Sequence, residues 1–332
     1  MEKIFKLKEN GTNVKTEIIA GITTFLAMAY ILAVNPSYLG GIDGMSAGAV
    51  FSATAISAGI ATLCMAFFAN YPVALASGMG LNAFFAFTVC GAMGYSYKVA
   101  LTAVFIEGII FMLLSLFKFR EALVNKIPSN LKFAITAGIG LFIAIIALLN
   151  ANVVVASEST TVALGELSSP TVVLSLVGLL IIGALQHYKV PGGILLGILI
   201  TWVLGIIAQL VGWYVPNPEA GVYSVIPQFS LSSFEAPKMF QFDFGFIAKN
   251  IPAFILIVFT FLYTDIFDTV GTLIGVAEKG KLLDKDGSLP NATGALMADA
   301  VGTVVGACFG TSTVTSYVES SAGVAAGGRT GL

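Results

Sequence analysis

Long apolar runs follow one another along the chain, and short polar stretches separate them. Each long run is close to the ~20 residues that a helix needs to cross the hydrocarbon core of a bilayer. The runs cover residues 17–38, 48–69, 73–92, 99–117, 131–149, 170–187, 191–212, 250–277 and 290–309, and a weaker run covers 311–328. The pattern therefore predicts an all-α polytopic membrane protein.

Composition supports the same fold class. The 332 residues are 57% hydrophobic and only 10% charged, with a mean hydropathy of +0.93. Soluble domains average about 25% charged residues, so a soluble enzyme, a disordered tail and a nucleic-acid binder are excluded. Cys64, Cys90 and Cys308 lie in apolar runs at unrelated spacings. We therefore predict no disulfide framework, no metal site and no cofactor.

Positive charges sort to one side of the membrane if the N-terminus is cytoplasmic. Alternate loops then hold every Lys and Arg except Lys98, Lys238 and Lys249, which is the asymmetry that the positive-inside rule describes. We expect a multi-pass protein of the cell membrane with a cytoplasmic N-terminal tail. This tail mixes both charge signs and lacks a small-residue cleavage site, so it is not a signal peptide.

The longest connection between spans contains four prolines and predicts an extracellular loop. Seven spans precede this loop, and because seven is odd, the spans after it start from the opposite side of the membrane. We therefore expect an inverted repeat. The predicted organisation is a cytoplasmic tail at 1–16, a first seven-helix repeat at 17–212, an extracellular loop at 213–249 and the first three helices of a second repeat at 250–332.

The third and tenth spans are poor helices at mid-depth. The third span has Ser77, Gly78 and Gly80 just before Asn82, and the tenth has a run of Thr, Ser and Val ahead of Glu319. Interior Gly disfavours a helix by about 1 kcal/mol, and β-branched runs favour extended backbone. Interrupted spans in corresponding positions of two halves point to the binding site of a transporter. We expect that site here.

Ionisable side chains inside a membrane are costly and need a reason. Asp265 and Asp268 lie three residues apart in the eighth span, and Glu319 begins the second piece of the tenth. Glu107 in the fourth span and Asp299 in the ninth are further candidates. We favour a functional role for Asp265 and Glu319, because both lie beside the predicted interruptions.

The other polar residues have plainer alternatives. Asp268 precedes Thr269 and equally fits a hydrogen bond to a neighbouring helix or a contact with substrate. Glu107 and Asp299 fit structural or gating roles better than ligand contact. Asn82 fits a helix cap, which is compatible with substrate contact.

Two carboxyl groups and a carboxamide in an apolar cavity suit a neutral, planar solute rich in N–H donors, because carboxylates accept hydrogen bonds and Asn both donates and accepts. Burial and a second acid favour the protonated form of a carboxyl group. Such a group could take up and release a proton during transport.

Four stretches resemble the nucleobase–cation symporter family, in its azaguanine-type branch of hypoxanthine, guanine and adenine permeases. They are TEIIAGITTFLAMAYILAVNP, ALASGMGLNAFFAF, FLYTDIFDTVGTLIGVAEKG and GTSTVTSYVESSAGVAAGGRTGL. The resemblance implies two inverted seven-helix repeats, core and gate domains, and short strands in broken helices 3 and 10. It implies import of purine nucleobases by proton symport with alternating access. It places substrate-binding residues at Gly80, Asn82, Asp265 and Glu319, with Asp268, Thr269 and Glu107 in coupling or supporting positions.

Several alternatives stay open at this point. The family continues past GGRTGL with about four more helices, so we expect an incomplete second repeat, and a non-transporting truncated fragment or sensor is one alternative. A permease of the same fold for uracil, xanthine or an anion is another. An intramembrane aspartyl protease needs aspartates on two helices, whereas Asp265 and Asp268 share one. The preferred purine, the choice of proton over sodium, and homodimer formation are not determined.

Overall fold

The computed structural model describes residues 2–116, 147–157, 160–188, 193–216, 224–226, 235–284 and 289–332, with Val190 and isolated residues between 134 and 145. The predicted span at 131–149 and much of the predicted loop at 213–249 lie outside these residues. Seven helices or helix pairs in the described part are long and apolar enough to cross a membrane. The prediction of a polytopic helical protein is therefore confirmed.

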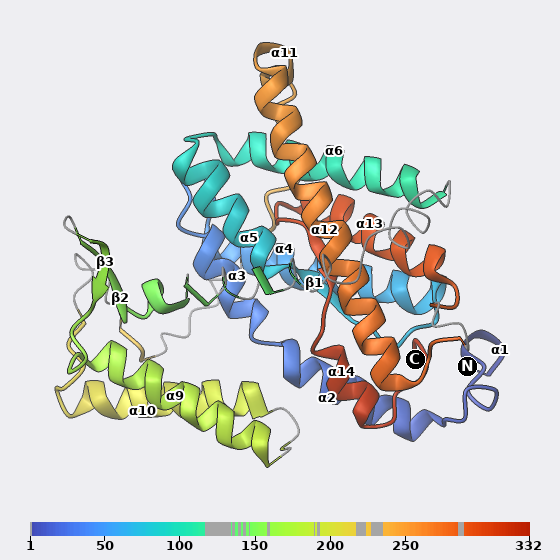
Figure 1. The fold of residues 1–332 in the computed structure, drawn as a ribbon, viewed down its shortest axis with the longest axis horizontal. Helices are drawn as coiled ribbons and strands as arrows, with labels where there is room; N and C mark the ends of the chain where they lie inside the picture. Colours follow the sequence, from blue (N-terminus) through green and yellow to red (C-terminus); the bar gives the residue numbers. More distant parts are fainter. Residues whose placement is uncertain are drawn as a thin grey trace. The chain divides into compact units, whose positions relative to one another are not determined.

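The helices and strands follow the predicted spans closely (Figure 1). The first part of the chain contains α1 (Glu2–Phe5), α2 (Val14–Met28), α3 (Ile31–Leu39), α4 (Ala47–Phe68), β1 (Leu75–Ser77), α5 (Met79–Ala83), the π-helix η1 (Phe84–Ala92) and α6 (Tyr97–Leu116). The later part contains β2 (Val154–Ser157), β3 (Thr161–Leu164), α9 (Pro170–His187), α10 (Gly193–Leu210), α11 (Gly245–Lys249), α12 (Ile251–Gly280), α13 (Ala292–Phe309), β4 (Val314–Ser316) and α14 (Ser320–Ala325).

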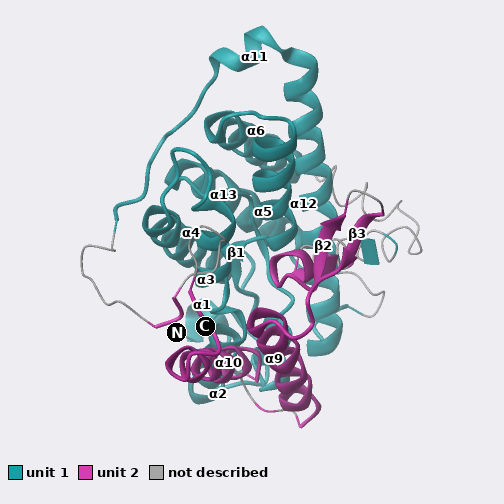
Figure 2. Cartoon of the chain, turned by 90° about the vertical axis from the view of Figure 1, so that its left-hand side faces the viewer, with its two compact units in different colours: residues 1–139, 234–332 teal, residues 140–233 magenta. Residues whose placement is uncertain are grey.

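The chain divides into two compact units, residues 1–139 with 234–332 and residues 140–233 (Figure 2). The second unit contains α9, α10 and an antiparallel β2–β3 hairpin that the hydrophobic pattern does not predict. In α9, a Cβ atom added at Gly178 would lie 2.6 Å from Thr201 Oγ1 of α10, so this glycine allows close helix packing. These compact units are defined by packing, whereas the predicted repeats are defined by the order and direction of the spans. The repeat boundaries therefore remain a prediction.

In the first unit, α13 packs against both α4 and α6. Small residues permit this close approach. A Cβ atom added at Gly302 would lie 2.8 Å from Ala61 of α4, and one at Gly108 of α6 would lie 2.8 Å from Val304 of α13. Helices in lipid associate largely through such packing. The small residues of the second span, α4, therefore allow α13 to pack closely against it.

The third and tenth spans are interrupted by strands that pair with each other. Strands β1 and β4 are antiparallel, with Ala76 opposite Thr315 at their centre. The pairing continues at both ends, where Gly78 N–H donates to Thr313 O and Tyr317 N–H donates to Ala74 O, each at 3.0 Å. Backbone groups at membrane depth must be satisfied within the protein. The predicted interruptions are therefore confirmed, and each one satisfies the other.

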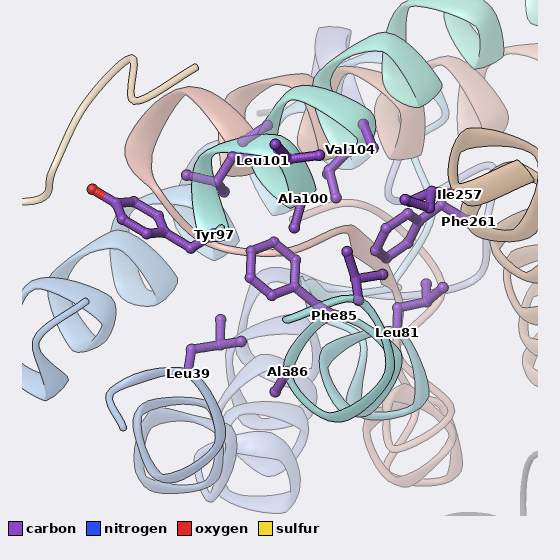
Figure 3. Packing of buried hydrophobic residues seen from close by; sticks show 14 of the residues in the cluster. Leu39, Leu81, Phe85, Ala86, Tyr97, Ala100, Leu101, Val104, Ile257 and Phe261 are labelled. Atoms are coloured by element: carbon purple, nitrogen blue, oxygen red, sulfur yellow. The ribbon is translucent and has the colours of Figure 1, made fainter. Parts of the chain in front are cut away.

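An apolar cluster holds α12 against η1 and α6. Phe261 lies fully buried among these elements, with Phe85 of η1 and Val104 of α6 in the same cluster (Figure 3). Its ring meets Phe84 edge to face, with the ring centroids 4.9 Å apart. Residues four apart share one side of a helix, so the stripe that buries Phe261 also directs Asp265 into the protein, where it is fully buried.

The N-terminal tail is partly packed rather than fully solvated. Residues 2–5 form the short helix α1, and Phe5 and Leu7 are buried against Ala66 of α4. The side chain of Asn70 donates to the carbonyl of Phe5 at 3.0 Å. The two apolar side chains among the lysines therefore anchor the tail to the first unit.

Glu17 joins the first span to the segment that follows α14. Its carboxylate is buried and accepts hydrogen bonds from the backbone N–H groups of Arg329, at 2.9 Å, and Thr330, at 3.4 Å. The guanidinium of Arg329 turns away and donates to Val324 O and Gly328 O. A buried carboxylate thus compensates for the helical hydrogen bonds that end with α14.

We predict that Glu17→Gln lowers the free energy of unfolding by about 1–3 kcal/mol, because an amide group turns one acceptor into a donor that faces buried N–H groups. Thermal unfolding in detergent micelles measures this change. The matched control is Glu9→Gln, which removes an exposed ion pair with Lys6 and should change stability by less than about 0.5 kcal/mol. Equal effects of the two substitutions would contradict the role of Glu17.

Candidate functional site

The candidate site is built around the pair of strands β1 and β4. The segment 311–316, which contains β4, carries hydroxyl side chains at five of its six positions, and all of these side chains are buried. Gly78, just after β1, permits the close crossing, because a Cβ atom there would lie 2.6 Å from Thr315 Cγ2. The strands therefore place a band of hydroxyl groups inside the apolar first unit.

Thr269 connects α12 to this band. Its hydroxyl lies 2.8 Å from Asp299 Oδ2, 2.9 Å from Thr315 Oγ1 and 3.4 Å from Asp265 Oδ1. Asp299, on α13, also accepts a hydrogen bond of 3.0 Å from Ser316 Oγ. One buried network thus joins α12, α13 and β4 and includes two of the predicted carboxyl groups.

Asp268 and Glu319 form a second acidic group beside the first. Both side chains are only partly buried, unlike that of Asp265. They lie close enough to interact electrostatically, and Thr315 hydrogen-bonds to Asp268. Glu319 immediately precedes α14 and accepts a hydrogen bond from the hydroxyl of Tyr30 in the first span. The sequence did not single out Tyr30, because a tyrosine in an apolar span carries no pattern of its own.

Asn82 does not cap the second piece of the third span. The helix α5 begins at Met79, its N-cap is Gly78 without a side-chain hydrogen bond, and Asn82 lies inside the helix. The carboxamide oxygen of Asn82 instead accepts from Ser312, while Nδ2 is buried and has no hydrogen-bond partner among the described residues. Gly80 is half-buried in the first turn of α5. An unsatisfied donor is thus available at the crossing.

Glu107 lies on a different helix from the acids described above. It is fully buried on α6, beside the glycine that packs against Val304 of α13. The structure therefore joins Asn82, Asp265, Asp268, Thr269 and Glu319 through the segment 311–319, and it places Glu107 on α6, which packs against α12 and α13.

A cavity of about 500 Å³ opens elsewhere in the first unit, between α2, α3 and α4. Its walls are almost entirely apolar and include Phe25, Leu32 and Leu63. None of the predicted substrate-binding residues lines it. The candidate site is accordingly defined by the hydrogen-bond network rather than by this cavity.

Comparison with known proteins identifies the family. A model described as the permease family matches residues 15–331. The chain belongs to this permease family. It is similar to a putative permease of Methanocaldococcus jannaschii, with 47% identity over all of this chain and 73% of that protein. It is similar also to the guanine/hypoxanthine permease PbuO of Bacillus subtilis, at 47% identity over 99% of this chain and 74% of that protein. The adenine permease AdeQ of Escherichia coli is 43% identical over all of this chain and 71% of that protein.

Solved structures share the fold of this permease. The transmembrane domain of the cyanobacterial bicarbonate transporter BicA aligns with a TM-score of 0.67 at 18% identity, covering 96% of this chain and 79% of that one. Murine Slc26a9, an anion transporter, aligns with a TM-score of 0.64 at 10% identity, covering 96% of this chain and 54% of that one. The predicted inverted-repeat transporter fold is confirmed, and the enzyme alternative, an intramembrane protease, is excluded by the family.

Two features of the permease site escape the sequence pattern. Asp299 was expected to be structural or gating, and its hydrogen bonds to Thr269 and Ser316 give it a linking position in the network. Ser312 donates a hydrogen bond to the carboxamide oxygen of Asn82. From the sequence, the run of hydroxyl residues around Ser312 predicted only extended backbone. The same run could have predicted a hydrogen-bond network, since hydroxyl side chains at membrane depth need polar partners.

We predict that Thr269→Val destabilises the permease by about 1–3 kcal/mol, because it preserves shape and removes the hydroxyl that donates to Asp299 within the buried network. The measurement is the thermal unfolding midpoint in detergent. Thr260→Val is the matched control on the same helix. The Thr260 hydroxyl donates to Leu256 O at 2.8 Å, one turn earlier in α12. A midpoint for Thr269→Val that equals that of the control would show that the network contributes little.

Proposed function

We propose that this permease imports purine nucleobases across the cell membrane, with guanine and hypoxanthine as the first candidates and adenine as a further one. The observation that carries the proposal is the pairing of two interrupted spans, beside which Asn82 keeps a buried donor without a described partner and Glu319 directly precedes α14. Relatives with 43–47% identity over nearly all of this chain are named as adenine and guanine/hypoxanthine permeases. The N-terminus is proposed to be cytoplasmic, from the distribution of Lys and Arg.

The proposed substrate site consists of Gly80, Asn82, Asp265 and Glu319, with Asp268 and Thr269 next to them. A purine base presents ring N–H groups and acceptor nitrogens along its edges. Glu319 and Asp268, which are partly exposed, would accept from the N–H groups, and the free Nδ2 of Asn82 would donate to an acceptor. Asp265 would support Thr269 from the buried side, and Gly80 would leave room for the base.

We also propose proton symport, with the acids of the site as the carriers. A carboxyl group can hold a proton in one state of the transport cycle and release it in another. Release of such a proton changes the charge of the site, whereas binding of a neutral base does not. We propose that alternating access of a core domain against a gate domain uses this change.

The anion alternative fits the site less well. The solved structures with this fold include a bicarbonate transporter and an anion transporter, and the likeness concerns the fold alone. Glu319 and Asp268 present negative charge where an anion would have to bind, which costs free energy through like-charge repulsion. A neutral base avoids that cost.

The deciding experiment is uptake of labelled hypoxanthine by cells that lack their own purine uptake and express the complete gene. Unlabelled guanine, adenine, xanthine, uracil and bicarbonate serve as competitors. We expect competition by purines alone. Uptake at the level of the empty vector, or competition by uracil or bicarbonate as strong as that by guanine, would overturn the proposed substrate class.

We predict that Glu319→Gln and Asp265→Asn each reduce purine uptake at least tenfold at equal membrane abundance. Glu319→Gln removes a charged acceptor of the base, and Asp265→Asn removes the charged partner of Thr269. A hydrogen bond to a charged group contributes about 1.5–3 kcal/mol, which corresponds to roughly ten- to a hundredfold in binding. Asp43→Asn, at an exposed loop position, is the matched control and should leave uptake unchanged. Normal uptake by either site variant would remove that residue from the site.

Proton coupling makes a separate prediction about the driving force. Uptake should rise when the outside is more acidic than the inside and should collapse when a protonophore is added, because the gradient that drives entry is lost. Replacing external sodium with choline should have no effect. Uptake that survives the protonophore and disappears without sodium would show that sodium, and not the proton, is coupled to transport.

A further inference from the structure

The first span contains a two-residue turn at the residue that reaches the proposed site. Helix α2 ends at Met28 and α3 begins at Ile31, with a turn between them. At this turn Tyr30 O accepts from the N–H group of Ala33 at 2.9 Å and also from that of Val34 at 3.0 Å, so a tighter bond accompanies the regular helical one. Tyr30 therefore lies in the turn between α2 and α3, which we call the joint in the first span, and its side chain extends from this turn.

The side chain of Tyr30 contacts the acid at the start of α14. Its hydroxyl donates to Oε1 of Glu319, a residue 289 positions later in the chain. Tyr317, two residues before Glu319, is buried. Its hydroxyl donates to Ser77 O at 2.5 Å. The two tyrosines thus have different partners, one on the candidate ligand Glu319 and one on the strand β1.

The short helix α14 is attached to α2 along its length. A Cβ atom added at Gly323 would lie 2.6 Å from Ala20 O and 2.1 Å from Thr24 Oγ1, so the two backbones are in direct contact. Glu17 secures the far end through the N–H groups of residues 329 and 330. The bond between Tyr30 and Glu319 secures the near end. The position of Glu319 therefore depends on the first span.

The chemistry of this contact selects one oxygen of the carboxyl group. A tyrosine hydroxyl that donates to Oε1 fixes the rotation of the Glu319 side chain and leaves Oε2 to accept from another donor. Hydrogen bonds to a carboxylate are among the stronger ones in proteins, and a ligand gains affinity when the group that binds it is already oriented. Without the hydroxyl, the carboxyl group would have to be ordered by the ligand itself.

We infer that Tyr30 is a positioning residue of the proposed site, which orients Glu319 for the N–H donor of the base and links it to the joint in the first span. This inference rests on the proposed function for the identity of the ligand. The contact between Tyr30 and Glu319 does not depend on it. The two can therefore be tested separately.

The test compares Tyr30→Phe with Tyr38→Phe, its matched control on α3, where the tyrosine ring packs on Phe87 with centroids 5.5 Å apart. Binding of hypoxanthine to the purified protein from the complete gene is measured by calorimetry. The infrared carboxyl band of Glu319 is assigned by its loss in Glu319→Gln. For Tyr30→Phe we expect roughly tenfold weaker binding, about 1.4 kcal/mol, and a shifted Glu319 band. Tyr38→Phe should change neither.

The outcomes separate the two claims. A Glu319 band in Tyr30→Phe at the wild-type position, or hypoxanthine binding of wild-type strength, would overturn the positioning role. A shifted band in a protein whose wild type binds no hypoxanthine, guanine or adenine would overturn the proposed function and support the contact between Tyr30 and Glu319. A shifted band together with weakened binding supports both.

Discussion

The pairing of β1 with β4 is the constraint on which the rest of the first unit depends. Two spans leave the helical conformation at membrane depth, where water cannot satisfy their backbone groups. Each strand supplies the hydrogen-bond partners that the other lacks, from Leu75 opposite Ser316 to Ser77 opposite Val314. Neither interruption would be stable without the other. Because the strands lie more than 200 residues apart in the chain, this pairing also brings the third and tenth spans together within the first unit.

The polar network follows from that pairing. Successive side chains of a strand point to opposite faces, so Thr315 of β4 reaches Thr269 and Asp268 of α12, and Ser316 reaches Asp299 of α13. Carboxyl groups that would be costly alone in an apolar interior thereby gain donors. The result is an acidic cluster whose fully buried members support the partly exposed ones.

Glycines set the distances at which these elements meet. Gly78 lets β1 approach Thr315, Gly302 lets α13 approach α4, and Gly323 lets α14 approach α2. Any side chain at these three positions would collide with backbone or with a packed neighbour. The abundance of glycine is therefore tied to the site as well as to helix packing, since a displacement at any of them would move Thr269, Asp299 or Glu319.

The sequence by itself determined the spans, the two interruptions and the acids inside the membrane, because apolar length, glycine and β-branched runs, and isolated charges are local signals. It selected Asp265 and Glu319 from the two interruptions, and the cap that it allowed for Asn82 as an alternative is not formed. Only the tertiary structure decided which side chains meet. The contacts of Tyr30 with Glu319, of Asn82 with Ser312 and of Thr269 with Asp299 join residues 30 to 289 positions apart, and no local pattern encodes a partner at that distance.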